Sequence, residues 1–277
     1  MQATPHTCKN CNHVFTGKYC NQCGEKVHKE EDKYIPHLFE DAFHFTTHFE
    51  GTFFNTLGAV IRRPGKLSLD YCNGLRKKYF KPISFFLMLV IIYLLFPLFE
   101  GLNMRLQYHV QHDLYGEWAM KKTLAVMQKK NLDQEAIADL FHRKGEKTSK
   151  FLLFLVIPVM GLFSWMMGFK KRRLYFDHFV FSIEISSFFI LWGFLVLPLL
   201  VMLGSKLGAE SFFNNESRIG LMILGGCFIY LLIATRKFFG FKWWYAVIYS
   251  LLYCIIMAFF IQWVYKFILF VVAINLI

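Results

Sequence analysis

The sequence predicts an all-α polytopic membrane protein with about five transmembrane helices, a small N-terminal zinc ribbon and an amphipathic interfacial helix. Composition, long apolar runs and one cysteine cluster predict this class. Hydrophobic residues make up 56% of the 277 positions, and 33 positions are Phe. An ordinary soluble domain is less apolar. We therefore divide the chain into a ribbon with its linker (1–34), amphipathic and juxtamembrane helices (35–82) and a transmembrane domain (83–277).

The apolar runs set the number of expected spans. About 20 apolar residues, at about 1.5 Å rise each, cross roughly 30 Å of hydrocarbon. The last run stays apolar to Ile277 apart from Gln262 and Lys266, so it is long enough to tilt, to break near Gln262 or to end in an interfacial piece. The five predicted spans are 83–102, 151–169, 176–203, 219–235 and 243–265.

Basic residues predict the orientation of these spans. Lysines and arginines concentrate in 62–81, 170–173 and 236–242, and all three clusters lie on one side if the N-terminus is cytoplasmic. Short cytoplasmic loops carry such an excess. The loop 103–150 also contains nine Lys and Arg, but long loops count less in this rule, and we expect it to be external and helical. The sequence therefore predicts a multi-pass protein with a cytoplasmic N-terminus.

Four cysteines predict a metal site in the N-terminal module. Cys8, Cys11, Cys20 and Cys23 form the pattern C-x2-C-x8-C-x2-C. Paired C-x2-C turns can surround one structural Zn²⁺ with four thiolates. A pair of disulfides is the alternative, and a reducing cytosol disfavours it. The remaining cysteines lie in or near apolar runs, where we expect them to be packing residues. They are Cys72, Cys227 and Cys254.

The charge of the ribbon bears on its partner. The whole chain carries a formal net charge of +12, yet residues 1–36 contain five Lys and four acidic residues, which gives 5 − 4 = +1. A nucleic-acid-binding module concentrates positive charge on itself, so this distribution argues against nucleic acid. The sequence instead favours a ribbon that contacts an unknown cytoplasmic protein or caps the fold.

A histidine-rich stripe follows the ribbon. In 35–50, three histidines and one aspartate recur at helical spacing beside an apolar stripe. Side chains at i and i+4 project together, so this line could hold a metal. It could equally be the polar edge of an interfacial helix. The residues of the stripe are His37, Asp41, His44 and His48.

The third span contains further polar residues. His178 lies near its start and Glu184 about two turns deeper. A carboxylate at membrane depth is expensive unless it is paired, protonated or facing a polar cavity. One interpretation joins both residues to the histidine stripe as a polar or metal cluster. The other is a packing role for Glu184 against a neighbouring helix.

A basic segment precedes the first span. Its residues could bind lipid phosphate groups, or they could do nothing beyond fixing the topology. The candidate headgroup contacts are Arg62, Arg63, Arg76, Lys77 and Lys78.

This segment also carries a resemblance. The cysteine ribbon is followed by Thr56-Leu57 with Arg63-Pro64-Gly65, and then by a pattern that enters the first span. That pattern is Tyr71, Gly74, Arg76, Tyr79 and Pro82. Together these elements resemble the domain-of-unknown-function family numbered 3667. The resemblance implies a bacterial inner-membrane protein with a zinc ribbon and several spans, and it implies no activity.

Three classes of function remain open. The first is an accessory or scaffold protein, which docks a cytoplasmic partner and forms homo-oligomers through close helix packing at Gly225 and Gly226. The second is a transporter, channel or lipid-handling protein that uses the Glu184 region. The third is a metal-dependent membrane enzyme, although the chain shows no familiar catalytic motif.

Overall fold

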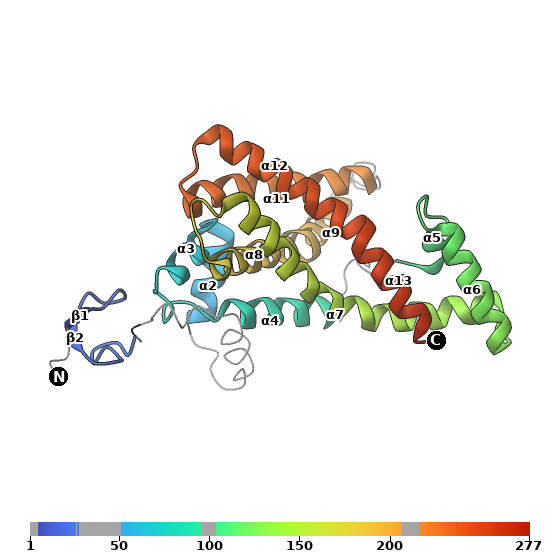
Figure 1. Ribbon diagram of the computed structural model, residues 1–277, viewed down its shortest axis with the longest axis horizontal. Helices are drawn as coiled ribbons and strands as arrows, with labels where there is room; N and C mark the ends of the chain where they lie inside the picture. The colour runs from blue at the N-terminus through green and yellow to red at the C-terminus, as the bar shows by residue number, and fades with distance from the viewer. Residues whose placement is uncertain (1–4, 26, 28–50, 96–103, 207–215) are drawn as a thin grey trace.

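The protein is mostly helical. The structure is a computed structural model and describes residues 5–25, 27, 51–95, 104–206 and 216–277. Within these residues a long helical body carries the small ribbon at one end (Figure 1). The predicted helical class is confirmed, and an N-terminal four-cysteine cluster accompanies it.

The ribbon contains the two strands. Strand β1 (Pro5–Thr7) pairs antiparallel with β2 (Val14–Thr16), with His6 opposite Phe15. Phe15 is buried beside Cys8 and Cys20. A module of this size has little apolar core, so a further constraint such as a metal is needed to stabilise it.

Three helices follow the ribbon: α2 (Thr52–Arg62), α3 (Lys66–Cys72) and α4 (Pro82–Leu95). Pro64 and Gly65 separate the first two, and Gly65 has a φ of 75°. Only glycine adopts this left-handed backbone readily. Pro82 opens α4, where its missing N–H costs no hydrogen bond.

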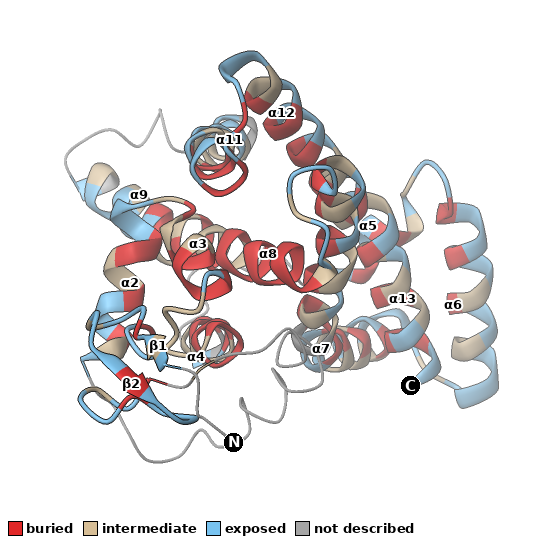
Figure 2. Ribbon diagram, turned by 60° about the vertical axis from the view of Figure 1, so that its left-hand side comes forward, coloured by how far each residue is buried: buried red, intermediate tan, exposed pale blue. Residues whose placement is uncertain are grey.

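Helix α8 (Tyr175–Ile190) lies at the centre of the body. It is buried along almost its whole length and packs between α3, α4, α7 and α11 (Figure 2). Its apolar side chains point to all sides of the helix, which is typical of such a position, and polar side chains lie among them. The chain then continues without a break through the π-helical segment η2 (Leu191–Val196) into α9 (Leu197–Lys206).

The C-terminal part of the chain, from Glu216 onward, is a helical hairpin. Helix α11 (Glu216–Phe239) turns at Gly240 into α12 (Trp243–Phe259). The π-helical segment η3 (Phe260–Tyr265) and α13 (Lys266–Asn275) follow directly. Gln262 therefore lies inside a continuous helical stretch that contains a π-helical segment.

Residues 104–168 make a second packing unit with α13. Helices α5 (Leu106–Val110) and α6 (Gly116–Lys130) and the first half of α7 (Gln134–Gly168) surround a cluster that includes Phe141 and Phe270. The Asp133 side chain accepts a hydrogen bond of 2.7 Å from the Ala136 N–H and so caps α7. This unit lies at the end of the molecule opposite the ribbon (Figure 1).

Three helical stretches are long and apolar enough to cross a membrane. They are Tyr175–Gly204, Arg218–Phe239 and Trp243–Asn275. A fourth is obtained if Gln134–Ser149 and Leu152–Gly168, which are bent by 46°, count as one span. By helix length and hydropathy the chain is thus a multi-pass membrane protein. The described residues supply three or four spans against the predicted five.

The difference lies in the first predicted span. Pro82–Tyr93 is an apolar helix, but it is shorter than a spanning helix. The remainder of that run, 96–103, lies outside the described residues. Its role as a span stays a prediction.

Candidate functional site

The four cysteine sulfurs form one cluster. All four lie within 4.8 Å of one another, with Cys8 Sγ 3.4 Å from Cys23 Sγ and Cys11 Sγ 3.6 Å from Cys20 Sγ. Sulfurs that bind Zn²⁺ tetrahedrally at about 2.3 Å lie about 3.8 Å apart. The cluster therefore fits one metal ion. Among the described residues it is the one group of three or more His, Cys, Asp or Glu side chains with this geometry.

The two halves of the cluster repeat the same backbone pattern. The N–H of Cys8 donates to His13 O at 2.8 Å, and the N–H of Cys20 donates to Glu25 O at 2.8 Å. Asn12 and Gly24 occupy equivalent positions with φ values of 60° and 70°. Each C-x2-C turn is thus closed by a left-handed residue, which asparagine and glycine tolerate.

One thiol of the cluster is more acidic than usual. The backbone N–H of Glu25 donates to the Cys23 sulfur, which lowers the pKa of Cys23 to about 6. A thiolate is the form that binds metal. The pKa of Cys11 moves the other way, to about 12: the His13 N–H lowers it, but burial and the three neighbouring thiols raise it. Four interacting thiols that lose their protons on metal binding suit a thiophilic metal ion.

The ribbon contacts the loop that follows α3. Lys9 Nζ donates to Asn73 O at 2.8 Å, and the Lys77 N–H donates to Glu25 Oε2 at 3.1 Å. Lys77 Nζ also donates to Cys23 O. Burial raises the pKa of Glu25, while the bond from the Lys77 N–H opposes that shift. The second cysteine turn is therefore fixed directly to the helical body.

Glu184 caps α3 from the centre of the bundle. Its carboxylate accepts from the Gly65 and Ser68 N–H groups at 2.8 Å each, from Ser68 Oγ, and from Tyr230 OH at 3.1 Å. The first N–H groups of a helix have no partner within that helix. A carboxylate satisfies them and complements the positive end of the helix dipole. Glu184 is fully buried, so this bond set locks α3 onto α8.

Gly65 allows the approach of α3 to α11. A Cβ atom at this position would lie 2.5 Å from Ala234 O and 2.9 Å from Ala234 Cα. Together with its positive φ, this contact explains why Arg63-Pro64 is followed by glycine. The segment α2–α3–α4 is thereby fitted to both α8 and α11.

Residues 50–94 match DUF3667, a family of proteins of unknown function. The resemblance seen in the sequence is confirmed over this segment, which we call the DUF3667 segment. No curated protein matches the chain, and no solved structure does. The matched family has no known activity, so we infer the function from the structure.

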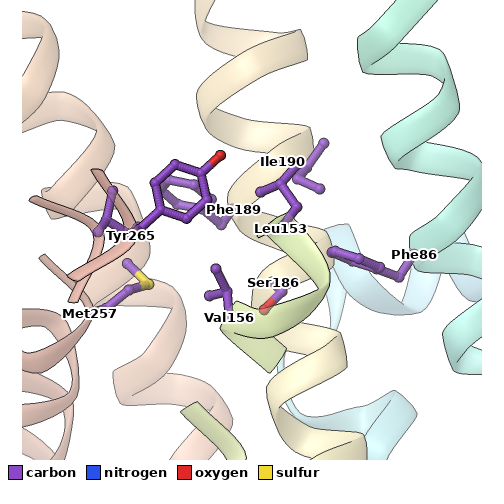
Figure 3. A pocket seen from close by; sticks show the side chains of 9 residues that line it. Phe86, Leu153, Val156, Ser186, Phe189, Ile190, Met257 and Tyr265 are labelled. Carbon is purple, nitrogen blue, oxygen red and sulfur yellow. The ribbon is translucent and has the colours of Figure 1, made fainter. Parts of the chain in front are cut away.

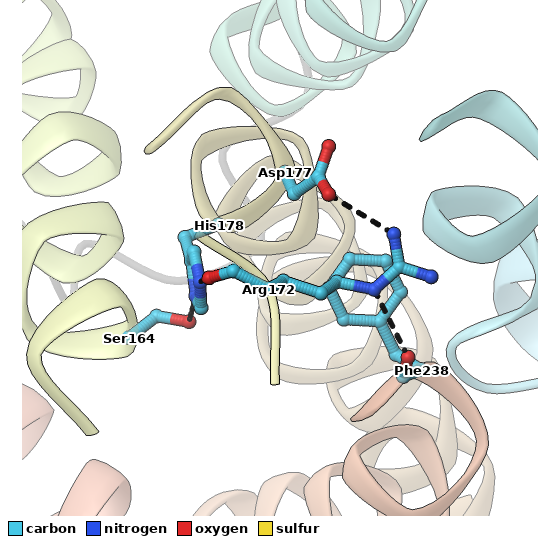
Figure 4. Close-up of polar contacts among 5 residues, drawn as sticks. All are labelled: Ser164, Arg172, Asp177, His178 and Phe238. Atoms are coloured by element: carbon cyan, nitrogen blue, oxygen red, sulfur yellow. Dashed lines mark hydrogen bonds and ion pairs between the residues drawn. The ribbon is translucent and has the colours of Figure 1, made fainter. Parts of the chain in front are cut away.

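His178 lies outside the DUF3667 segment and belongs to a separate polar chain (Figure 4). Ser164 Oγ lies 2.9 Å from His178 Nδ1 and accepts from Tyr249 OH at 2.7 Å, while His178 Nε2 lies 2.8 Å from Arg172 O. A neutral imidazole satisfies this arrangement if Nε2 donates and Nδ1 accepts. Both ring nitrogens are then occupied by the protein itself.

Arg172 extends this polar chain toward the next helix. Its Nη1 lies 3.0 Å from Asp177 Oδ2, its Nε donates to Phe238 O at 3.2 Å, and its guanidinium lies 4.2 Å from the Phe238 ring centroid (Figure 4). The basic loop 170–173 is therefore bonded to the end of α11. His178 and Glu184, which the sequence grouped, serve different contacts.

A small pocket adjoins the Glu184 helix on another side. It has a volume of about 20 Å³, and its lining includes Phe86, Val156, Ser186, Met257 and Tyr265 (Figure 3). Such a volume holds about one water molecule. Ser186 supplies its hydroxyl to a lining that is otherwise mainly apolar.

The five basic residues expected at headgroup level take three different positions. Arg62, Arg63 and Lys78 line one surface pocket. Lys77 contacts the ribbon, as described above. The Arg76 guanidinium lies 5.1 Å from the Tyr71 ring centroid and 5.4 Å from that of Phe176.

The histidine stripe cannot be placed. His37, Asp41, His44 and His48 lie outside the described residues, so their convergence on a metal stays a prediction. Sequence reasoning also missed the partners that matter most in the described part: Ser68, Ser164, Tyr230 and Tyr249. No local signal marks them, because each meets its partner on a different helix, only after the helices have packed.

Proposed function

We propose that this chain is an accessory or scaffold protein of a bacterial inner membrane. Its ribbon binds one structural Zn²⁺ and presents a docking surface to a cytoplasmic protein. The attachment of the second cysteine turn to the DUF3667 segment carries this proposal. A module fixed to the membrane body by Lys9, Glu25 and Lys77 holds a bound partner at a defined place.

The interior of the helical body supports a scaffold over a transporter. A transport pathway needs polar groups that water or substrate can reach. Glu184 is fully buried and accepts from four donors, and His178 uses both ring nitrogens. These groups join helices, which is the packing role.

The donor set also supports a structural metal over a catalytic one. Four thiolates complete the tetrahedral shell of Zn²⁺, whereas a catalytic site keeps one position open. With the metal bound, Cys8, Cys11, Cys20 and Cys23 would hold the two turns together and stabilise the ribbon.

The arrangement of the basic loops supports a cytoplasmic ribbon. Arg172 bonds to Phe238 O, Arg236 lies 4.9 Å from the Trp243 ring centroid, and α3 packs on α8 and α11. The three basic clusters thus gather at the ribbon end of the molecule, and α5 and α6 lie at the other end (Figure 1). This is the charge asymmetry expected of a cytoplasmic face.

Two exposed side chains offer the docking surface. Val14 and Tyr19 are each 60% exposed on the ribbon, and exposed apolar and aromatic side chains commonly anchor protein contacts. The decisive variant is V14E/Y19E, because it changes this surface and leaves the four cysteines intact.

The experiment uses the full chain in detergent as bait in extracts of its own host. We expect one zinc per wild-type chain and per V14E/Y19E chain, and a protein captured by the wild type alone. A C20S chain should lose the zinc. Equal capture by wild type and V14E/Y19E would contradict docking through the ribbon, whatever the zinc content.

A further inference from the structure

A surface pocket of about 260 Å³ lies within the DUF3667 segment. It lies between α2 and the residues that lead into α4. Three basic side chains, Arg62, Arg63 and Lys78, line it together with Phe54, Gly58 and Tyr79. None of the described residues that line it is acidic. The pocket therefore concentrates positive charge in a concave site, where a field is stronger than over a flat surface.

Asp70, the acidic residue that is bonded to Tyr79 of the lining, is already paired. Asp70 Oδ1 lies 2.6 Å from Lys66 Nζ, and Asp70 Oδ2 accepts from Tyr79 OH at 2.6 Å. Asp70 is buried, whereas Arg62, Arg63 and Lys78 are exposed. The three cations are therefore available to an anion from outside.

The walls of the pocket are fixed by hydrogen bonds. Thr56 Oγ1 accepts from the Phe80 N–H at 2.8 Å and donates to Thr52 O at 2.8 Å. This bond fastens the chain before α4 to the middle of α2, while the bond from Tyr79 to Asp70 fastens the floor. A site whose frame is already ordered loses less entropy when it binds a ligand.

The position of the pocket relative to the membrane follows from the apolar helix α4, which begins close to it. Lys78 and Tyr79 come three to four residues before Pro82, where the apolar helix α4 begins. The pocket therefore lies close to the polar end of an apolar helix, which is the level of lipid headgroups. Phe54 is 68% exposed on its wall, and exposed aromatic side chains are typical of this level.

We propose that Arg62, Arg63 and Lys78 form a binding site for a phosphate group, carried by an anionic phospholipid or by a soluble phosphate compound. Arginine guanidinium groups bind phosphate oxygens in bidentate fashion, and a lysine adds a point charge. Arg76 and Lys77 take no part, because one lies against Tyr71 and Phe176 and the other contacts the ribbon.

The test compares two triple variants of the full chain. R62Q/R63Q/K78Q removes the proposed site. K170Q/K171Q/R173Q removes the same charge from exposed positions at the same end of the molecule and serves as the matched control. Both should keep the wild-type melting temperature, since these side chains lie at the surface.

Binding of phosphatidylglycerol to the detergent-solubilised chain is measured by native mass spectrometry, with phosphatidylcholine as the zwitterionic reference. Each side chain that hydrogen-bonds the bound phosphate directly contributes at least about a fivefold gain in affinity, whereas a basic side chain that does not touch the lipid contributes less. We therefore expect R62Q/R63Q/K78Q to lose about a hundredfold in affinity for phosphatidylglycerol, and the control to lose less than fivefold. Equal loss in both variants, or no loss in either, would overturn the site.

A second arm separates the two sources of phosphate. Inorganic phosphate at millimolar concentration is added to the lipid-bound wild type. Retention of the lipid supports a headgroup site that also uses the apolar wall. Displacement of the lipid by phosphate supports a site for soluble phosphate compounds, provided that R62Q/R63Q/K78Q no longer binds the ion.

Discussion

Replacing Glu184 by leucine should weaken the attachment of α3 to the helix bundle and destabilise the fold. The substitution keeps an apolar side chain at the position but removes the acceptor of four hydrogen bonds. Ser68 Oγ still has Val180 O at 3.5 Å. The N–H groups of Gly65 and Ser68 and the hydroxyl of Tyr230 lose the acceptor that holds them.

The magnitude follows from these three donors. A buried donor without a partner costs about 1–3 kcal/mol, so the sum is about 3–9 kcal/mol before the structure relaxes. After relaxation we expect the free energy of unfolding to fall by about 4 kcal/mol. For a chain of this size this corresponds to a fall of roughly 10 °C in Tm. The Tm of Glu184→Gln should fall by about a third as much, because the glutamine side chain keeps one acceptor oxygen.

The assay is thermal unfolding in detergent, followed by tryptophan fluorescence. Ser186→Ala is the matched control, since Ser186 lies on the same helix two residues away and is only half-buried. We expect the control to melt within about 2 °C of the wild type. If Glu184→Leu melts within that same range, the carboxylate does not hold α3, and the capping argument is refuted.

Three further predictions concern other parts of the molecule. Gly226→Ala should lower the Tm by several degrees, because a Cβ at Gly226 would lie 2.3 Å from Trp192 Nε1. Gly225→Ala should leave the Tm unchanged, because a Cβ there meets nothing within 4 Å. Equal melting curves for the two variants would contradict this packing. Burial lowers the pKa of His109 from 6.5 to about 4, so the unfolded chain binds the proton first as the pH falls. Urea unfolding should therefore show a loss of about 3 kcal/mol between pH 6.5 and pH 4 that is absent in His109→Gln; a loss of the same size in both proteins would exclude His109 as its cause. Cys20→Ser should reduce the zinc content of the purified chain from one to none without preventing its insertion into membranes, as checked by elemental analysis and membrane fractionation. Unchanged zinc would rule out a four-cysteine site.

Local spacing was enough to predict some features. Cys8, Cys11, Cys20 and Cys23 come together because each C-x2-C turn closes within six residues, and one short hairpin joins the two turns. The membrane class follows from apolar length, which is a property of consecutive residues. The order of basic and apolar segments in the DUF3667 segment was readable in the same way.

Other features needed the folded chain. The sequence marked Glu184 as costly but left its role open, because its partners Gly65 and Ser68 are 119 and 116 residues away. It placed Arg62 and Arg76 in one basic group, and helix packing separated them, with one in an open pocket and the other against aromatic rings.

The sequence by itself thus determined that this protein has helices apolar enough to enter a membrane, carries a four-cysteine module and concentrates basic residues beside its apolar helices. Only the tertiary structure decided which polar side chains hold the bundle together and which remain open to a ligand. The physical reason is that hydrophobicity and short-range spacing are encoded in neighbouring residues, whereas the satisfaction of a buried polar group depends on residues that meet only after the helices have packed.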